Sequence, residues 1–169
     1  MPWSYRYDAT AEVLITTATG VLSESELVGG MQRLCADPQC QRSVRIFGDY
    51  STVDRFEVTE EGVRPRLPPD CLAAIEGRCA VLMFQPLGSA NFRRVLDAAK
   101  VAHGRVFAER RAALEWINEG VPEGRRLTLE ATMAALPRPA FGLLADLDRA
   151  RSIRANRPPG DGPSGAPFH

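Results

Sequence analysis

The chain has 169 residues, enough for one domain of ordinary size with a single core. Hydrophobic residues make up 44% of the chain and charged residues 25%, a balance that excludes a disordered or membrane-embedded class. Basic and acidic residues are equal at 21 each, so no basic surplus indicates a nucleic-acid partner.

The first predicted elements are a hairpin and a helix. Apolar and polar residues alternate over Trp3–Asp8 and, less strictly, over Glu12–Thr19, which predicts two antiparallel strands ending at Gly20. Ser23-Glu24-Ser25-Glu26 has the form of a capping box, in which the serine hydroxyl and the glutamate carboxylate satisfy free amides reciprocally. The helix that follows is expected to stop at Asp37-Pro38.

Three further strands are predicted at apolar runs, over Val44–Phe47, Cys79–Phe84 and Arg105–Phe107. The first of them ends abruptly in Gly48-Asp49, and we expect a polar loop from Asp49 to Phe56. In open α/β sheets ligands and partners meet the carboxyl ends of strands. This predicted loop is therefore the expected working edge of the domain.

Helices are predicted between and after these strands. Helical spacing indicates a helix beginning at Ser89 and another over Glu109–Asn118, and shorter helices near Val58 and over Asp70–Glu76. Beyond Gly120, two helical segments are expected over residues 129–136 and 141–153.

Together these elements predict an α/β domain over residues 1–120. We expect a small mixed sheet of about five strands, opened by an antiparallel hairpin and covered by about four helices. A helical C-terminal extension is expected over residues 121–155, and the proline- and glycine-rich residues 156–169 are expected to be a disordered tail.

The four cysteines, Cys35, Cys40, Cys71 and Cys79, show no Cys-x-x-Cys spacing and lack nearby histidines, so we expect no metal site and no cofactor. We expect no secretory signal or membrane span and a cytoplasmic location of bacterial type, where the cysteines stay thiols. A redox pair between the first two, which flank a turn, is the alternative.

Several of these segments resemble the STAS-like superfamily, which contains anti-sigma-factor antagonists and SEC14-related bacterial domains. The resemblance covers about residues 3–119 and is carried by Ile46-Phe47-Gly48-Asp49, by Arg78–Leu82, and by Arg105–Phe107 with Ala113–Ile117. It implies a small mixed sheet with helices over one face. It also implies a regulatory hydroxyl just after the third strand, where this chain has Ser51 and Thr52.

The predicted loop supplies the first set of candidate site residues, Asp49, Ser51, Thr52 and Asp54. A phosphate on either hydroxyl would bring nearly two negative charges to the surface and could eject or recruit a partner. The competing interpretation is that both hydroxyls cap a turn. The two aspartates are interpreted as turn residues in preference to metal ligands.

A second set of candidate residues would bind a ligand. Ser89 with Arg93 could cradle an anion at a helix start, although an ordinary serine cap is the simpler interpretation. Arg64 and Arg66 could form the lid of a cavity for an amphipathic or lipid-like ligand, or belong to an exposed connector. His103 is interpreted as structural, since a sequence cannot show that a nucleophile and a carboxylate meet it.

No catalytic constellation is visible, so we expect a non-enzymatic STAS-like regulatory or protein-interaction module that binds another, unidentified protein. The alternative is a small-molecule or lipid-like ligand-binding domain of the SEC14-related type, with a small apolar ligand under Thr59–Glu76. A homodimer stays open, because an edge strand such as Trp3–Asp8 can pair between chains.

Overall fold

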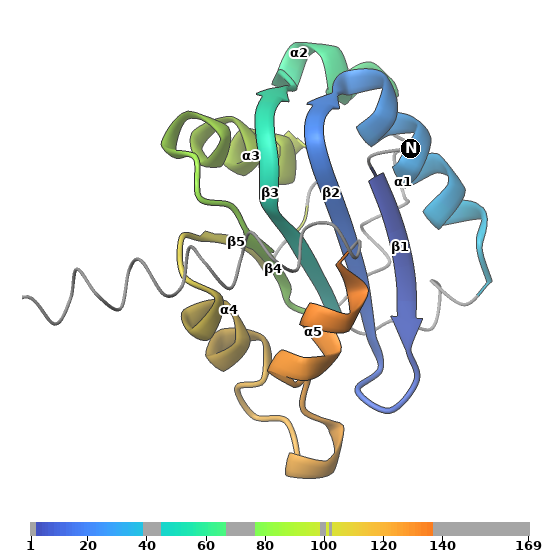
Figure 1. The fold of residues 1–169 in the computed structure, drawn as a ribbon. Helices are drawn as coiled ribbons and strands as arrows, with labels where there is room; N and C mark the ends of the chain where they lie inside the picture. Colours follow the sequence, from blue (N-terminus) through green and yellow to red (C-terminus); the bar gives the residue numbers. More distant parts are fainter. Residues whose placement is uncertain (1–2, 39–44, 67–76, 99–100, 102, 137–169) are drawn as a thin grey trace, which may run out of the picture. The chain divides into compact units, whose positions relative to one another are not determined.

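The computed structural model describes residues 3–38, 45–66, 77–98, 101 and 103–136, which form a five-stranded sheet with helices (Figure 1). The strands lie in the order of the sequence: β1 (Trp3–Asp8), β2 (Val13–Ser23), β3 (Arg45–Glu57), β4 (Cys79–Leu82) and β5 (Gly104–Phe107). The first two pair antiparallel, and every later pair is parallel. The predicted α/β fold with its opening hairpin is confirmed.

The helices are α1 (Glu24–Ala36), α2 (Glu60–Val63), α3 (Pro86–Ala98), α4 (Arg110–Ile117) and α5 (Leu129–Ala135), with short 3₁₀ turns over Arg64–Arg66 and Glu123–Arg125. All of them belong to one compact unit, Met1–Pro137. The helices predicted over residues 70–76 and 141–153, and the tail 156–169, lie outside the described residues. No helix in the described ranges has the length and apolarity needed to cross a membrane.

Local signals account for the start of α1. The Ser23 hydroxyl accepts a hydrogen bond from the Glu26 backbone amide at 3.4 Å, and the Glu26 carboxylate accepts one from the Ser23 amide at 3.2 Å. This is the predicted capping box, and it satisfies two amides that the first turn leaves free. The helix ends at Ala36, with Asp37 as its C-cap before the proline, as predicted.

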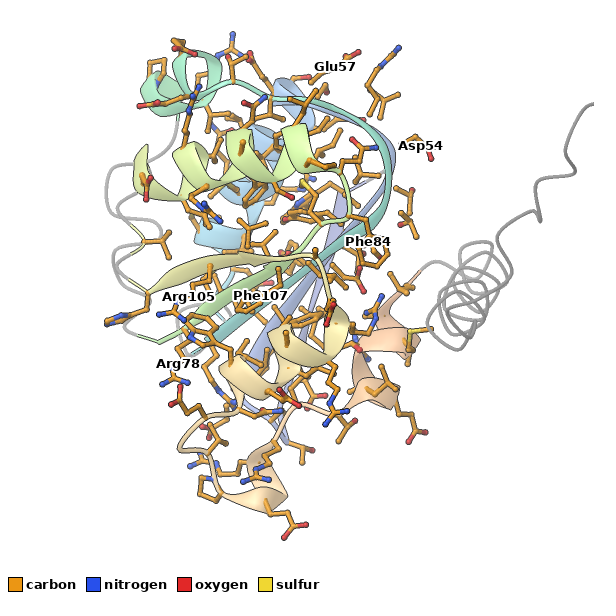
Figure 2. All side chains as sticks on the ribbon, turned by 90° about the vertical axis from the view of Figure 1, so that its left-hand side faces the viewer. Asp54, Glu57, Arg78, Phe84, Arg105 and Phe107 are labelled. Atoms are coloured by element: carbon orange, nitrogen blue, oxygen red, sulfur yellow. The ribbon has the colours of Figure 1, made fainter. Side chains whose placement is uncertain are left out.

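Apolar side chains pack on both faces of the sheet, and not on one face as the resemblance implied. One face packs against α1 and α3 through residues that include Leu27, Met31, Phe92 and Val95. The other packs against α4 and the segment after it through residues that include Phe47, Leu82, Ile117 and Leu127. Figure 2 shows α3 and α4 on opposite sides of β4 and β5. The domain is therefore a three-layer α/β structure.

The four parallel strands begin at one edge of the sheet but end at different levels. At the amino ends Val13 pairs with Arg45, and Cys79 pairs with both Ile46 and Gly104. β4 and β5 are short, whereas β2 and β3 continue together until Ser23 pairs with Glu57. The sheet thus has an aligned amino edge and a two-stranded extension at its carboxyl edge.

The prediction that the second strand ends at Gly20 is wrong. The strand continues to Ser23, and Gly20 lies inside it with a φ of +67° at an irregularity of the β2–β3 register. Glycine adopts this left-handed backbone without steric cost, so it allows a bulge within a continuous strand.

Tyr50 links β3 to β1, to β2 and to helix α3 through its side chain. Its hydroxyl accepts a hydrogen bond from Trp3 Nε1 at 3.2 Å and lies 3.1 Å from the Thr16 hydroxyl, while its ring contacts Phe92 at 5.2 Å between centroids. Burial raises the pKa of Tyr50 to about 12, because the phenolate would lose its hydration; the two hydrogen bonds oppose this effect.

This raised pKa predicts an alkaline loss of stability. The folded pKa of Tyr50 lies above the ordinary value of 10.0, so its contribution is complete below pH 10 and is lost as the pH rises towards 12. Between pH 10 and pH 12 the unfolding free energy of the wild type should therefore fall by roughly 2–3 kcal/mol more than that of Tyr50→Phe, as measured by urea denaturation. Its tyrosinate absorbance should also lack a step near pH 12.

Tyr7→Phe is the control, since it leaves Tyr50 in place. Equal alkaline losses of stability in the wild type and in Tyr50→Phe would contradict the prediction.

Candidate functional site

The segment predicted as a polar loop, Asp49–Phe56, is part of strand β3, so the prediction of a loop is wrong. Its backbone pairs with β2 as far as Glu57, through two register shifts that accommodate bulges. On the other side, the pairing with β4 stops at Asp49 and Leu82. Among the described residues, the carboxyl half of β3 is therefore paired on one side only.

The buried Asp49 side chain contacts two partly buried polar side chains, those of Ser51 and Arg110. We call these three residues the Asp49 cluster. The Asp49 side chain is 0% exposed and forms an ion pair with Arg110 Nη1 from the first turn of α4. The other Asp49 carboxylate oxygen accepts from the Ser51 hydroxyl at 2.6 Å and from the Ser51 amide at 3.2 Å. Arg110 Nη2 also donates to the Ser51 hydroxyl at 3.3 Å.

The Asp49 cluster explains why polar residues occur inside a strand. A buried carboxylate is tolerated only when it is paired and hydrogen-bonded, and Arg110 and Ser51 supply both. The cluster fixes α4 against β3. Asp49 is thus a structural residue, and Ser51 is engaged by it.

The remaining two candidates of the predicted loop differ from each other. Thr52 is half-buried and donates its hydroxyl proton to the Ala18 carbonyl at 3.0 Å, so it joins β3 to β2. Asp54 is exposed and lies at the carboxyl end of β3 (Figure 2). Of the four predicted residues, this one offers its side chain to solvent.

Exposed residues occur at this end of β3 and at the start of α3. We call Asp54, Arg55, Glu57 and Leu87 the β3-tip surface. Leu87, in the first turn of α3, is 84% exposed, and the adjacent Gly88 approaches Phe56 of β3. The carboxamide of Gln85 donates to the Val53 carbonyl at 2.8 Å and also to that of Asp54, which holds the start of α3 beside the strand.

The predicted ligand-binding residues do not form one site among the described contacts. Helix α3 begins at Pro86, so Ser89 is not a cap; its hydroxyl donates to the carbonyls of Gln85 at 2.9 Å and Met83 at 3.3 Å. Arg93 is exposed on the same helix. Arg66 is exposed and offers its carbonyl to Gln32, while the side chain of Arg64 lies outside the described residues.

A pocket of about 510 Å³ lies at the opposite, amino-terminal edge of the parallel strands, and no sequence prediction identified it. Arg45, Arg78 and His103 line it from the starts of β3, β4 and β5. The segment after α4 supplies the other wall, with Glu119, Gly120, Val121, Pro122 and Arg125. The one signal in the sequence was a charged or titratable residue at the start of each apolar strand.

Arg45 is the most deeply buried cation of this pocket, at 8% exposure. Its terminal nitrogens donate to the carbonyls of Ile117 at 3.1 Å, Arg125 at 2.9 Å and Ala11, and to the Asn118 side chain at 3.3 Å. All four acceptors are uncharged. Burial lowers the pKa of Arg45, although nearby Glu12 opposes this effect.

The cysteines differ from the expectation of free thiols in one respect. Cys35 is disulfide-bonded, so the prediction of a thiol there is wrong, and Cys40 and Cys71 lie outside the described residues. Cys79 is a free, buried thiol on β4. Burial raises the pKa of Cys79 to about 12, so it behaves as a small core hydrophobe.

No known protein-family model matches the chain, and no curated protein is significantly similar to it. The resemblance to the STAS-like superfamily therefore stays a prediction.

The Asp49 cluster gives a direct stability prediction. Arg110→Met leaves the buried Asp49 carboxylate without its cation, so we expect unfolding free energy to fall by about 3–5 kcal/mol in urea denaturation. Asp49→Leu combined with Arg110→Met removes both charges and should recover a large part of that loss.

The matched control is Arg111→Met on the same helix. Arg111 is 90% exposed and pairs with Glu115, so its loss should cost less than about 1 kcal/mol. Equal losses for Arg110→Met and Arg111→Met would show that the ion pair with Asp49 does not hold α4.

Proposed function

We propose that this chain is a non-enzymatic, cytosolic regulatory module of STAS-like type that binds another protein through the β3-tip surface. The observation that carries the proposal is the one-sided pairing of β3 beyond Asp49. This extension carries exposed charged side chains away from the layered core. A surface built in this way is accessible to a partner without any rearrangement of the fold.

The composition of the β3-tip surface suits a protein partner. Leu87 is an exposed apolar residue at the start of α3, which Gln85 holds beside the backbone of Asp54, so a partner can bury one apolar anchor and add polar contacts next to it. Arg55 and Glu57 pair at 2.6 Å but are 69% and 48% exposed. Because such surface pairs contribute little, both groups can exchange their partners when a second protein binds.

Backbone pairing by an added strand is the less favoured mode of binding. Gln85 already occupies the carbonyls of Val53 and Asp54 with its side-chain amide. An incoming strand would have to displace it. We therefore assign recognition to the side chains of the β3-tip surface, with a partner that presents a basic and apolar patch.

Neither Ser51 nor Asp49 belongs to the proposed contact surface. A phosphate on Ser51 would replace its hydrogen bond to Asp49 by repulsion between two anions. Such a change would disturb the packing of α4 before it created a binding contact. The alternative function, binding of a small apolar ligand under Thr59–Glu76, concerns a segment that lies largely outside the described residues.

The test is a comparison of captured partners. Asp54→Lys, Glu57→Lys and Leu87→Ser combined in one variant reverse the charge and remove the apolar anchor, all at exposed positions. Affinity purification from host cells with quantitative mass spectrometry should show partners of the wild type that are depleted at least tenfold with this variant. The reason is that loss of one anchor and two charge contacts costs more than about 1.4 kcal/mol.

Arg111→Gln with Glu115→Gln is the control, since it changes an exposed ion pair on α4, away from the β3-tip surface. The control should retain every partner of the wild type. Equal capture by all three proteins, or no specific partner for the wild type, would contradict the proposed function.

A further inference from the structure

The amino edge of the sheet carries a row of charged or titratable residues over a pocket. Cys79 donates its backbone amide to the His103 carbonyl and Ile46 donates to the Arg78 carbonyl, both at 2.9 Å, so these strand starts are adjacent. Arg45, Arg78 and His103 therefore lie side by side at the ends of three neighbouring strands. All three line the pocket of about 510 Å³.

The pocket has an excess of positive charge. Three arginines and two glutamates line it, so the charges of these five side chains sum to one positive charge. Arg45 is the most buried of these arginines; Glu12 lies near it, but its hydrogen bonds go to uncharged oxygens and no described carboxylate bonds to it. A buried cation without a contacting anion is costly, and a bound anion would offset that cost.

The two other arginines have carboxylate partners that a ligand can displace. Arg78 pairs with Glu119 at 2.6 Å, and the glutamate side chain is 66% exposed. Arg125 pairs with Glu12, with both side chains at least one-third exposed. Exposed pairs of this kind contribute less than about 1 kcal/mol, so exchange of either glutamate for a ligand anion costs little.

Arg78 is held in position independently of Glu119. Its guanidinium lies 5.2 Å from the centre of the Trp116 ring and donates to the Trp116 carbonyl. Arg105 lies over the same ring, at 5.3 Å. The stacked guanidinium therefore stays at the pocket wall when the carboxylate leaves, which is the preorganisation that anion binding requires.

We propose that this pocket binds a small metabolite through a phosphate or carboxylate group, held by Arg78 and Arg125 above the buried charge of Arg45. A volume of about 510 Å³ is that of a metabolite site and exceeds what a single inorganic ion needs. Planar arginine forks bind both kinds of anion with two parallel hydrogen bonds. The site is separate from the β3-tip surface, and the two proposals stand on different observations.

The experiment titrates inorganic phosphate and, separately, malonate into the full chain at constant ionic strength, with chloride as the balancing salt. Amide chemical shifts report the location of binding. We expect saturable shifts at His103, Gly120 and Val121, which line the pocket, and none at Asp54 or Arg55. Preference for one probe over the other identifies the anion as a phosphate or a carboxylate.

Variants separate a built site from general attraction of anions. Arg125→Gln should weaken binding of the preferred probe at least fivefold, because it removes one of the two guanidinium forks. Glu119→Gln removes the competing carboxylate of Arg78 and should strengthen binding about two- to fivefold. Arg111→Gln, at an exposed position of α4, should leave binding unchanged.

The opposite direction of these two changes keeps the test informative even if one variant is less stable. The absence of saturable shifts with both probes, weaker binding after Glu119→Gln, or unchanged binding after Arg125→Gln would each overturn the proposal.

Discussion

The parallel ladder between β2 and β3 is the constraint on which the rest of the structure depends. It begins where Val13 meets Arg45 and ends where Ser23 meets Glu57, and β4 and β5 cover only its first part. At the amino edge all four parallel strands start together, which brings their first residues into one row. At the carboxyl edge two strands extend alone, which exposes the β3-tip surface.

Both proposed sites follow from this arrangement. The amino edge collects cations around a pocket, including the buried Arg45, whose hydrogen bonds go to uncharged oxygens. The carboxyl edge presents Leu87 and three charged side chains on a support fixed by Gln85 and Phe56.

Features with a local cause could be predicted from the sequence. Alternation predicted the hairpin, and Ser23 with Glu26 predicted the start of α1. The carboxyl half of β3 could not be predicted, because its polar residues resemble a turn until distant partners are known. Asp49 is satisfied by Arg110, 61 residues later, and Tyr50 by Trp3, 47 residues earlier. The pocket likewise requires the register that brings separate strand starts together.

The continuity of β3 is most directly measured by amide hydrogen exchange, resolved by residue, in the folded protein. If residues 50–57 form a strand paired with β2, several of their amides should exchange slowly, with protection comparable to that of Ile46 and Phe47. Uniformly fast exchange from Tyr50 to Glu57 would show that the ladder ends at Asp49 and would contradict the account of the carboxyl edge.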